Sequence, residues 1–252
     1  MSEPAKRRRT ALVTGGSRGI GAAVAQALAA SGFDVAITYA TNSAAAAQIV
    51  DLCRVEGAAA HAFQADLADL EAVPRLFGLL DDRFDRLDVL VNNAGVLPPA
   101  AQVCDIDSKR ATWVLTVNAL AYLCCAREAV VRMSTSKGGS GGVIVNISSR
   151  AAVRGAAGEF VDYAMSKAAV DVMTIGLAQE VGGEGIRVVG IRPGLIVTDM
   201  NDVHSGRLER LLDTVPMGRP GTVSEVAEVV AWLVSPGASY LTGVTIDVSG
   251  GR

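Results

Sequence analysis

Charged and aromatic residues are scarce in this sequence. Of its 252 residues only 19% are charged and 4% are aromatic, and the net charge is −3. Such a surface offers no broad electrostatic attraction to nucleic acids or anionic membranes, so we predict a small-molecule partner and neither of these two. Half of the residues are hydrophobic, which argues against disorder and predicts helices packed closely on a sheet.

Cysteine and histidine are scarce too, and their spacing argues against several chemistries. The four cysteines have neither CxxC spacing nor the density of a secreted disulfide scaffold, so we interpret them as small core residues in a reducing cytoplasm. His61 and His204 stand alone, without an HExxH motif or a Cys/His cluster, and no metal site is predicted.

The N-terminal region lacks the apolar core of a signal peptide. No apolar run in the chain approaches the roughly 20 residues of a membrane span, so no membrane partner is expected. Lys6 to Arg9 form a short basic run, and we interpret residues 1–9 as a flexible, solvated leader. These absences predict a cytoplasmic protein.

Short β-type runs alternate with Ala-rich helical stretches along the whole chain. The β-type runs are expected at 10–14, 34–39, 59–64, 88–91, 143–147, 187–191 and 243–248. Helices are expected at 22–31, 43–56, 71–84, 107–133, from about 160 onward, and at 224–234. This alternation predicts a single α/β domain, residues 10–252, with helices on both faces of a parallel sheet. Residues 192–220 are less regular, as lids and binding loops commonly are.

A glycine-rich loop follows the first expected strand directly. Residues 14–21 read TGGSRGIG, and a helix is expected immediately after them. Glycines permit a tight turn and let a diphosphate approach the helix N-terminus, where free N–H groups and the helix dipole favour anions. The GxxxGxG spacing departs from the commoner GxGxxG fingerprint, and an ordinary glycine turn is the alternative. The strand–loop–helix context nevertheless predicts a dinucleotide site.

The charge near the end of the second expected strand bears on the choice of nicotinamide cofactor. NAD sites usually carry an acidic residue there, whereas residues 38–42 read TYATN and contain none. Arg18 in the glycine loop could bind a 2′-phosphate, because a guanidinium suits phosphate geometry. We therefore predict NADP (NADPH), with NAD possible. The alternative is that Arg18 packs on the surface and points to solvent.

Tyr163 and Lys167 stand four residues apart in a stretch expected to be helical from about residue 160. This spacing places the phenol and the ammonium on one helix face, one turn apart. A cation near a phenol lowers the phenol pKa from about 10 towards working pH, which makes the tyrosine a usable general acid or base. The alternative is a packed ring beside a solvated charge.

These motifs together resemble those of a classical short-chain dehydrogenase/reductase. The resemblance rests on TGGSRGIG, NNAG at 92–95, Asn118, Ser149 and YAMSK at 163–167, and it extends to the end of the chain. It implies a single Rossmann-type, doubly wound domain with about seven parallel strands. It also implies a homotetramer and a catalytic tetrad of Asn118, Ser149, Tyr163 and Lys167.

The resemblance gives each member of the tetrad a role. Tyr163 would exchange a proton with the reacting oxygen. Lys167 would lower the tyrosine pKa and bind the nicotinamide ribose, and Ser149 would orient and polarise the carbonyl. Asn118 would hold a water that relays protons to the lysine. Because one extra residue stands between the serine and the tyrosine, Ser148 is the fallback for Ser149.

The same resemblance implies a set of cofactor contacts along the chain. The residues are Gly15, Gly16, Ser17, Arg18, Gly19, Ile20, Asp66, Leu67, Asn93, Ala94, Gly95, Tyr163, Lys167, Pro193, Gly194, Ile196 and Thr198. For Asp66, a plain helix-capping role is the alternative. The irregular stretch up to about Pro216 would be a substrate lid.

We therefore predict an NADP-preferring oxidoreductase that interconverts a carbonyl and a secondary alcohol, and a ketone or 3-oxoacyl reductase is the first candidate. An NAD(P)-dependent sugar or polyol dehydrogenase is the alternative enzyme. A non-catalytic cofactor-binding regulator is the alternative from another class, and the intact tetrad argues against it.

Overall fold

Seven parallel strands form one sheet in the computed structural model, which describes residues 8–198 and 206–252. The sheet order is β3-β2-β1-β4-β5-β6-β7. The strands are β1 (Arg9–Val13), β2 (Phe33–Tyr39), β3 (Ala60–Gln64), β4 (Val89–Asn92), β5 (Gly142–Ile147), β6 (Ile186–Pro193) and β7 (Val244–Val248). The chain winds outward from β1 in one direction and from β4 in the other. The predicted doubly wound α/β fold is confirmed.

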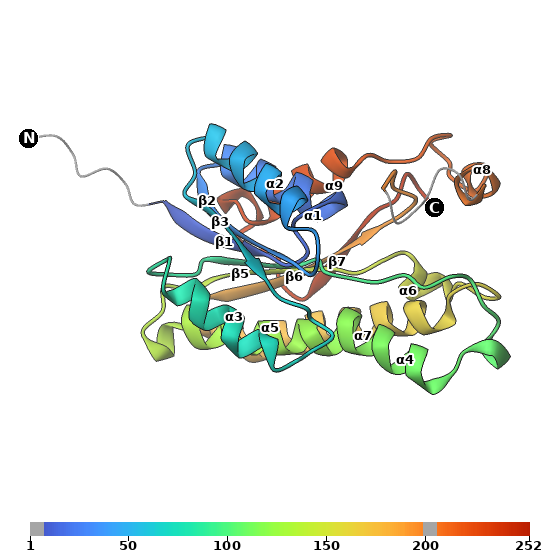
Figure 1. Ribbon diagram of the computed structural model, residues 1–252, viewed down its shortest axis with the longest axis horizontal. Helices are drawn as coiled ribbons and strands as arrows, with labels where there is room; N and C mark the ends of the chain where they lie inside the picture. The colour runs from blue at the N-terminus through green and yellow to red at the C-terminus, as the bar shows by residue number, and fades with distance from the viewer. Residues whose placement is uncertain (1–7, 199–205) are drawn as a thin grey trace, which may run out of the picture.

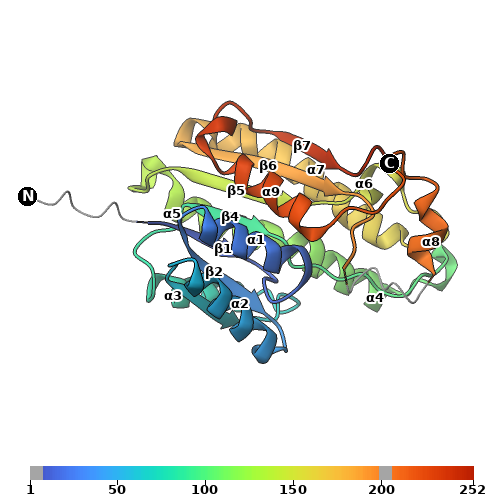
Figure 2. The same ribbon diagram turned by 90° about the horizontal axis from the view of Figure 1, so that it is seen from above.

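Helices cover both faces of this sheet (Figure 1). One layer holds α1 (Gly19–Ala30), α2 (Ser43–Val55) and α9 (Val223–Leu233), and the other holds α3 (Ala72–Asp81), α5 (Ala121–Met133) and α7 (Val161–Val181). Three shorter helices, α4 (Ser108–Leu115), α6 (Ala151–Arg154) and α8 (Arg207–Leu212), lie beyond the carboxyl ends of the strands (Figure 2). These three helices therefore flank the edge of the sheet where α/β proteins bind ligands.

The hydrophobic core lies on both faces of the sheet, because successive strand residues point to opposite sides. In β1, Ala11 and Val13 pack with α1, α2 and α9, whereas Leu12 packs with α3 and α5. All three side chains are fully buried. Strand segments covered on both faces are accordingly apolar without interruption, as residues 11–13 of β1 show.

The first strand begins one residue earlier than the sequence predicts. Arg9 is the first residue of β1, and its guanidinium lies 4.3 Å from the centroid of the Phe33 ring. Arg8 donates hydrogen bonds to the carbonyl oxygens of Ala29 and Phe33 and pairs with Asp34. These contacts hold both arginines, so the predicted flexible leader does not extend to them. Residues 1–7 lie outside the described residues.

A long helical segment runs from Ser108 to Met133 through α4, a π-helical turn (Thr116–Leu120) and α5. It is long and apolar enough to cross a membrane by length and composition, which corrects the expectation that nothing in the chain approaches a spanning length. Ala121, Cys125 and Ala129 on one side of α5 are fully buried against the sheet. This packing is that of a core helix.

The four cysteines are free, and they are not all core residues. Cys53 and Cys125 are buried, and burial raises the thiol pKa to about 11 for Cys53 and about 12 for Cys125. Cys124 is half-buried and Cys104 is exposed, because it lies in the loop between β4 and α4. The interpretation of all four as core residues is therefore wrong for Cys104.

Candidate active site

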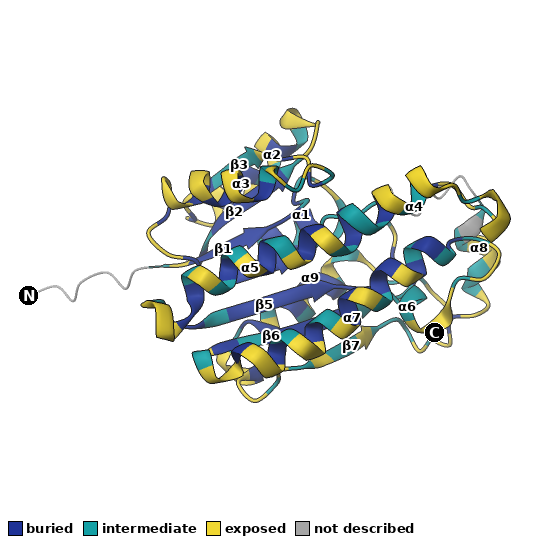
Figure 3. Cartoon of the chain, turned by 90° about the horizontal axis from the view of Figure 1, so that it is seen from below, coloured by how far each residue is buried: buried dark blue, intermediate teal, exposed yellow. Residues whose placement is uncertain are grey.

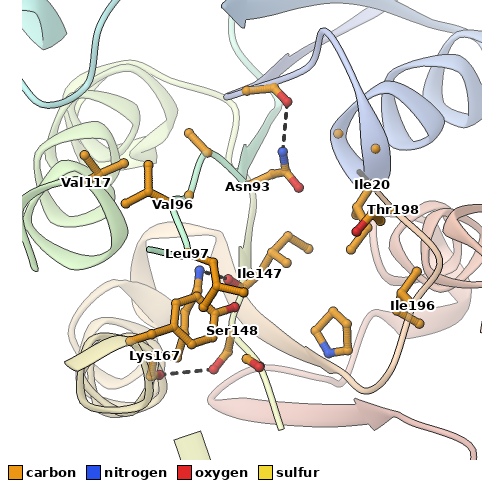
Figure 4. Close-up of a pocket in the computed structure, with 18 of the residues that line it drawn as sticks. Ile20, Asn93, Val96, Leu97, Val117, Ile147, Ser148, Lys167, Ile196 and Thr198 are labelled. Carbon is orange, nitrogen blue, oxygen red and sulfur yellow. Dashed lines mark hydrogen bonds between the residues drawn. The ribbon is translucent and has the colours of Figure 1, made fainter. Parts of the chain in front are cut away.

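A cavity of about 1070 Å³ opens at the carboxyl ends of the strands. Its walls come from the loops that follow β1, β2, β3, β4, β5 and β6, together with the first turns of α7. It spans the point where the sheet order reverses between β1 and β4, the usual ligand position in an open α/β sheet. Figure 4 shows part of the lining, with Lys167 on α7 facing the loop that carries Val96 and Leu97.

The glycine loop is shaped so that its backbone forms part of the cavity wall. Gly15 and Gly19 have positive φ angles of 63° and 56°, which side chains rarely adopt. A Cβ on Gly21 would lie 2.4 Å from the Gly15 oxygen and from the Asn93 amide nitrogen, so no larger residue fits there. α1 begins at Gly19 without a side-chain cap, which leaves the first N–H groups of the helix for an anion.

The end of β4 is tied to this glycine loop. Asn93 donates from its side-chain amide to the oxygens of Thr14 (2.9 Å) and Gly15 (3.1 Å). The Thr14 hydroxyl accepts hydrogen bonds from the backbone N–H groups of Asn93 (2.9 Å) and Ala94 (3.0 Å). These four bonds fix the loop backbone against the central strands, so the cavity floor is rigid before any ligand arrives.

The far end of the cavity lies beyond β2 and β3 and is polar. Asn42 caps α2 by accepting from the Ala45 N–H at 2.9 Å. Asp66 accepts from the Ala68 N–H at 2.9 Å in a turn, so part of its carboxylate has a structural role. The Arg18 side chain is exposed, lines the same cavity and makes no hydrogen bond or ion pair to the residues that the structure describes. Its guanidinium is therefore available to a ligand.

Lys167 and Tyr163 lie one turn apart on α7, and both line the cavity. The Lys167 side chain is only 3% exposed, which contradicts the alternative of a solvated charge. Its Nζ donates to the Ile147 carbonyl at 2.8 Å and to the Tyr122 hydroxyl at 3.2 Å, and it lies 5.9 Å from the centroid of the Tyr163 ring. Burial lowers the Lys167 pKa to about 7, and the charge of Asp171 opposes this shift.

The two adjacent serines after β5 play different parts. Ser148 is buried, and its hydroxyl donates to the Lys167 carbonyl at 3.1 Å (Figure 4). Ser149 is half-buried, and its hydroxyl accepts from the Ala151 N–H at 3.1 Å, which leaves its own hydrogen free to donate. Both residues line the cavity. The geometry favours Ser149 over Ser148 as the residue that could donate to a ligand.

Asn118 lies in the π-helical turn and is fully buried. Its side chain accepts from the Val96 N–H at 2.8 Å and donates to the Val96 carbonyl at 2.9 Å and to the Ser166 hydroxyl at 3.2 Å. Both amide hydrogens are thus used within the protein, and only oxygen atoms of Asn118 remain to hold the predicted water. The side chain clamps the loop after β4 to α7.

A second clamp holds the residue next to Tyr163. Arg110 on α4 donates to both carboxylate oxygens of Asp162, at 2.8 and 3.3 Å, and to the Pro99 carbonyl at 2.7 Å. Asp162 also accepts from the Tyr163 N–H at 3.0 Å. Burial tends to raise the Asp162 pKa, but the hydrogen bonds from Arg110 and Tyr163 outweigh it and lower the pKa below its usual value. The charged pair therefore anchors the first turn of α7.

Known proteins of similar sequence are oxidoreductases. A family model described as enoyl-(acyl carrier protein) reductase matches residues 15–252. The uncharacterized oxidoreductase YgfF of Escherichia coli strain K12 is 46% identical over 244 residues, which cover 96% of this chain and 99% of that protein. The 3-oxoacyl-(acyl-carrier-protein) reductase FabG of Staphylococcus aureus is 36% identical over 249 residues, which cover 98% of each chain.

The similarity extends from the sequence to the three-dimensional fold of a solved structure. A short-chain dehydrogenase from Burkholderia cenocepacia J2315, in complex with NADP, matches with a TM-score of 0.91 and 36% identity over 97% of each chain. The chain belongs to the short-chain dehydrogenase/reductase (SDR) family. It is therefore an NAD(P)-dependent oxidoreductase, and the resemblance inferred from its motifs is confirmed.

Most residues implied by the SDR resemblance line the one cavity. They are Gly15, Ser17, Arg18, Gly19, Ile20, Asp66, Leu67, Asn93, Ala94, Gly95, Ser149, Tyr163, Lys167, Pro193, Gly194, Ile196 and Thr198. Gly16 and Asn118 do not line it. Gly16 faces inward, where a Cβ would lie 2.7 Å from the Ile37 side chain, and Asn118 lies behind Gly95. These two residues therefore lie behind the surface of the SDR site and support its wall from inside the protein.

Sequence reasoning missed two features of the SDR site, Tyr122 and the Arg110–Asp162 pair. Tyr122 lies behind Lys167, and the pair holds the start of α7. The only local signal was an acidic residue directly before Tyr163, where the first turn of a helix favours negative charge. Tyr122 gave no signal, because it lies 45 residues from Lys167 in the chain.

Two histidines were predicted to take no part in metal binding. His61 lies on β3 with its ring 5.6 Å from that of Phe84, edge to face, and burial lowers its pKa, as do the charges of Arg83 and Arg54. His204 lies outside the described residues. Within residues 8–198 and 206–252, no three His, Cys, Asp or Glu side chains form a group that could hold a metal ion.

Proposed function

We propose that this SDR protein is an NADP-preferring oxidoreductase that interconverts a carbonyl and a secondary alcohol, with Tyr163 as the general acid/base. One observation carries the proposal: a buried lysine lies beside a cavity-lining tyrosine in the same cavity as the glycine loop. A ketone or 3-oxoacyl reductase is the first candidate, and the Staphylococcus aureus relative, named as a 3-oxoacyl reductase, supports it.

The cavity residues fit a dinucleotide. The uncapped first turn of α1 and the positive-φ glycines would take the diphosphate, and Arg18 would face the adenosine ribose. Thr198 and the loop after β6 line the cavity on the nicotinamide side. When bound, the nicotinamide supplies or accepts the hydride, and the protein positions the substrate and moves the proton.

The chain's own residues then account for the proton chemistry. In reduction the Tyr163 phenol gives its proton to the carbonyl oxygen, and in oxidation the phenolate takes the alcohol proton. Ser149 has a free hydroxyl hydrogen that can donate to the same oxygen and stabilise the negative charge developing on it. The Lys167 amine, held near the Tyr163 ring, stabilises the phenolate through its positive charge.

Arg18 offers a direct test of the cofactor preference. Arg18→Ala is expected to raise the KM for NADPH by about 10-fold and to leave the KM for NADH unchanged, because a charge-assisted bond to the 2′-phosphate is worth about 1.5–3 kcal/mol. Steady-state rates with both cofactors measure this change. Arg154→Ala, which removes an exposed arginine elsewhere in the cavity lining, is the matched control. Equal or better use of NADH by the unaltered protein contradicts the NADP preference.

The substrate end of the cavity favours a ketone over a sugar. Its lining includes Val96, Leu97, Trp113, Val117 and Phe160, all apolar. A sugar or polyol site needs several hydrogen-bonding groups to replace water around the hydroxyls, whereas an apolar wall suits an acyl or alkyl chain. A panel of ketones, 3-oxoacyl thioesters, sugars and polyols separates the two enzyme classes. The predicted lid continues into residues 199–205, which lie outside the described residues.

We also propose that the protein is a homotetramer in the cytoplasm, with no nucleic-acid or membrane partner. Two separate apolar surfaces support two interfaces between copies of the chain. The first lies on α5, the adjoining π-helical turn and α7, whose outer sides are exposed side by side (Figure 3); its large exposed side chains are Leu120, Leu123, Val131, Met165, Val172 and Ile175. The second lies around β7 and α9 and includes Trp232, Tyr240 and Val244. Two interfaces of twofold type generate a closed tetramer.

The helix surface is expected to be necessary for the tetramer. Val172→Glu places a charge in the middle of α7, where burial against a second copy would cost several kcal/mol, so dimers should replace tetramers. Light scattering after gel filtration measures the mass. Leu52→Glu, at a similarly exposed apolar residue on α2, is the control and should leave the mass of four chains unchanged. A monomer in the unaltered protein contradicts the proposal.

A further inference from the structure

We propose that Tyr122 is a positioning residue, whose phenol oxygen accepts a hydrogen bond from the Lys167 amine and holds that amine towards the cavity. The inference rests on the proposed function, because it assigns Tyr122 to the proton chemistry of the same site. Tyr122 acts through Lys167 and does not itself line the cavity.

The contact geometry defines the arrangement. Tyr122 lies on α5 and is 1% exposed. Its hydroxyl donates to the Ile147 carbonyl at 3.3 Å and accepts from Lys167 Nζ at 3.2 Å, while Nζ donates to the same carbonyl at 2.8 Å. The amine also lies 4.8 Å from the centroid of the Tyr122 ring, within cation–π range. Three polar atoms from α5, α7 and β5 thus form a closed triangle, to which Lys167 and Ile147 contribute from the cavity lining.

Tyr122 contributes a side-chain hydrogen-bond acceptor to this triangle, whereas the acceptor of Ile147 is a backbone carbonyl. Its hydroxyl accepts a hydrogen bond from Nζ at 3.2 Å. The other groups that face the amine are the Tyr163 ring and the Asp171 carboxylate on α7, the Ile147 carbonyl on β5 and the Asn118 oxygen across Gly95. Asp171 is engaged by Arg192 at 2.7 Å, so its charge is partly neutralised.

The protonation states suit this role. Burial raises the Tyr122 pKa well above its ordinary value, as does its proximity to Tyr163, so the phenol remains neutral over the working range. A neutral hydroxyl that has given its hydrogen to Ile147 has lone pairs left for the amine. Such a bond favours the charged ammonium over the neutral amine, because a charged donor makes the stronger bond. Tyr122 therefore opposes the effect of burial on Lys167.

Packing alone does not require the hydroxyl. A phenylalanine would fill the same space on α5, and the Ile147 carbonyl would keep its bond from Lys167. A buried hydroxyl without a partner would be unfavourable. The Tyr122 hydroxyl has its partners in the Ile147 carbonyl and the Lys167 amine. Tyr122→Phe removes this one group and leaves the ring.

Direct titration of Lys167 in the cofactor-free protein tests the inference. The chain has four lysines, so protein labelled with ¹³C at lysine Cε gives few signals, and Lys167→Met identifies the one from Lys167. Tyr122→Phe is expected to lower the Lys167 midpoint by about 1 pH unit, a tenfold loss of proton affinity. Tyr240→Phe, at a fully exposed tyrosine, should leave it unchanged. An identical midpoint in Tyr122→Phe and the unaltered protein overturns the inference.

The pH dependence of alcohol oxidation gives a second readout. A less protonated Lys167 stabilises the Tyr163 phenolate less, so the pH midpoint of kcat in Tyr122→Phe should move upward by about 0.5–1 unit, with the KM for NADP unchanged within about twofold. A purely structural role for Tyr122 would lower the rate at every pH without moving the midpoint, which overturns the inference. Absence of turnover in the unaltered protein contradicts the proposed function but leaves the titration test intact.

A measurement on the unaltered protein covers the case in which Tyr122→Phe does not fold. Labelling at tyrosine ¹³Cζ gives four signals, and the signal of Tyr122 is identified by elimination with phenylalanine variants of the other three tyrosines. The inference predicts that the Tyr122 signal shifts with the Lys167 midpoint while the phenol stays protonated. A Tyr122 signal that does not change across that midpoint overturns it.

Discussion

Tyr163→Phe is expected to lower kcat by roughly 10²–10⁴-fold, the range that a general acid/base contributes. The substitution removes the phenol hydroxyl and keeps the ring that lines the cavity beside Lys167. The Kd for NADPH should change by no more than about twofold, because the glycine loop and the loop after β6 provide most of the cavity surface for the dinucleotide. Steady-state kinetics and a fluorescence titration with NADPH measure the two quantities.

Two comparisons make this result specific to the proposed mechanism. Tyr240→Phe removes a hydroxyl from a fully exposed tyrosine and should leave both kcat and Kd unchanged. If Tyr163→Phe turns over as fast as the unaltered protein, another group transfers the proton and the mechanism is wrong. If the unaltered protein binds NADPH but converts no member of the substrate panel, the alternative of a cofactor-binding regulator gains support.

The features that the sequence predicted correctly are local in the chain. The strands were found from short β-type runs, and all seven began within one residue of the predicted position. The glycine loop could be located because its strand, turn and helix are contiguous. Tyr163 and Lys167 could be paired because four residues make about one turn of α7. In each case the spacing along the chain determines the geometry.

The features that the sequence could not predict depend on contacts between distant segments. Lys167 meets Tyr122 across 45 residues, and Arg110 meets Asp162 across 52. These contacts require the packing of α4 and α5 against α7, which no local pattern specifies. The serine assignment is different, because Ser148 and Ser149 are neighbours. Only the structure shows that the Ser148 hydroxyl donates to the Lys167 carbonyl while the Ser149 hydroxyl accepts from the Ala151 N–H and keeps its own hydrogen.

The π-helical turn is another feature that the sequence did not predict. Residues 107–133 were predicted as one helix, and the structure has α4, the wide turn and α5 in that span. The wide turn contains Asn118, whose side chain bonds to Val96 and Ser166 instead of facing the cavity. Propensity gives no sign of such a turn, because it arises from these tertiary contacts.

Lys167→Met is expected to stabilise the folded protein at pH 6 while lowering kcat by at least about 10²-fold. The Lys167 pKa is about 7 in the folded protein and about 10.4 in an unfolded chain. Between these values the unfolded state binds more protons, so the free energy of unfolding of the unaltered protein rises with pH across that window. The rise is on the order of 4 kcal/mol, and below pH 7 the whole penalty is present.

A methionine has no proton to bind, so the contribution of residue 167 to the pH dependence disappears in the variant. At pH 6 the variant avoids the cost of burying an ammonium, but it leaves the Tyr122 hydroxyl and the Ile147 carbonyl with one partner fewer, which costs about 1–2 kcal/mol. A net gain of about 2 kcal/mol is therefore expected at pH 6, with the advantage lost above about pH 10.

Urea unfolding at pH 6, 8 and 10, at one fixed protein concentration, measures this difference between the two proteins. Lys137→Met, at an exposed lysine, is the control and should follow the unaltered protein at every pH. Equal pH dependence in Lys167→Met and the unaltered protein would mean that water reaches the amine and that burial does not govern its charge. The expected result instead means that Lys167 lowers the stability of the fold at neutral pH and supplies the charge that Tyr163 needs. Such a conflict between stability and activity is found at positions where function, rather than folding, selects the residue.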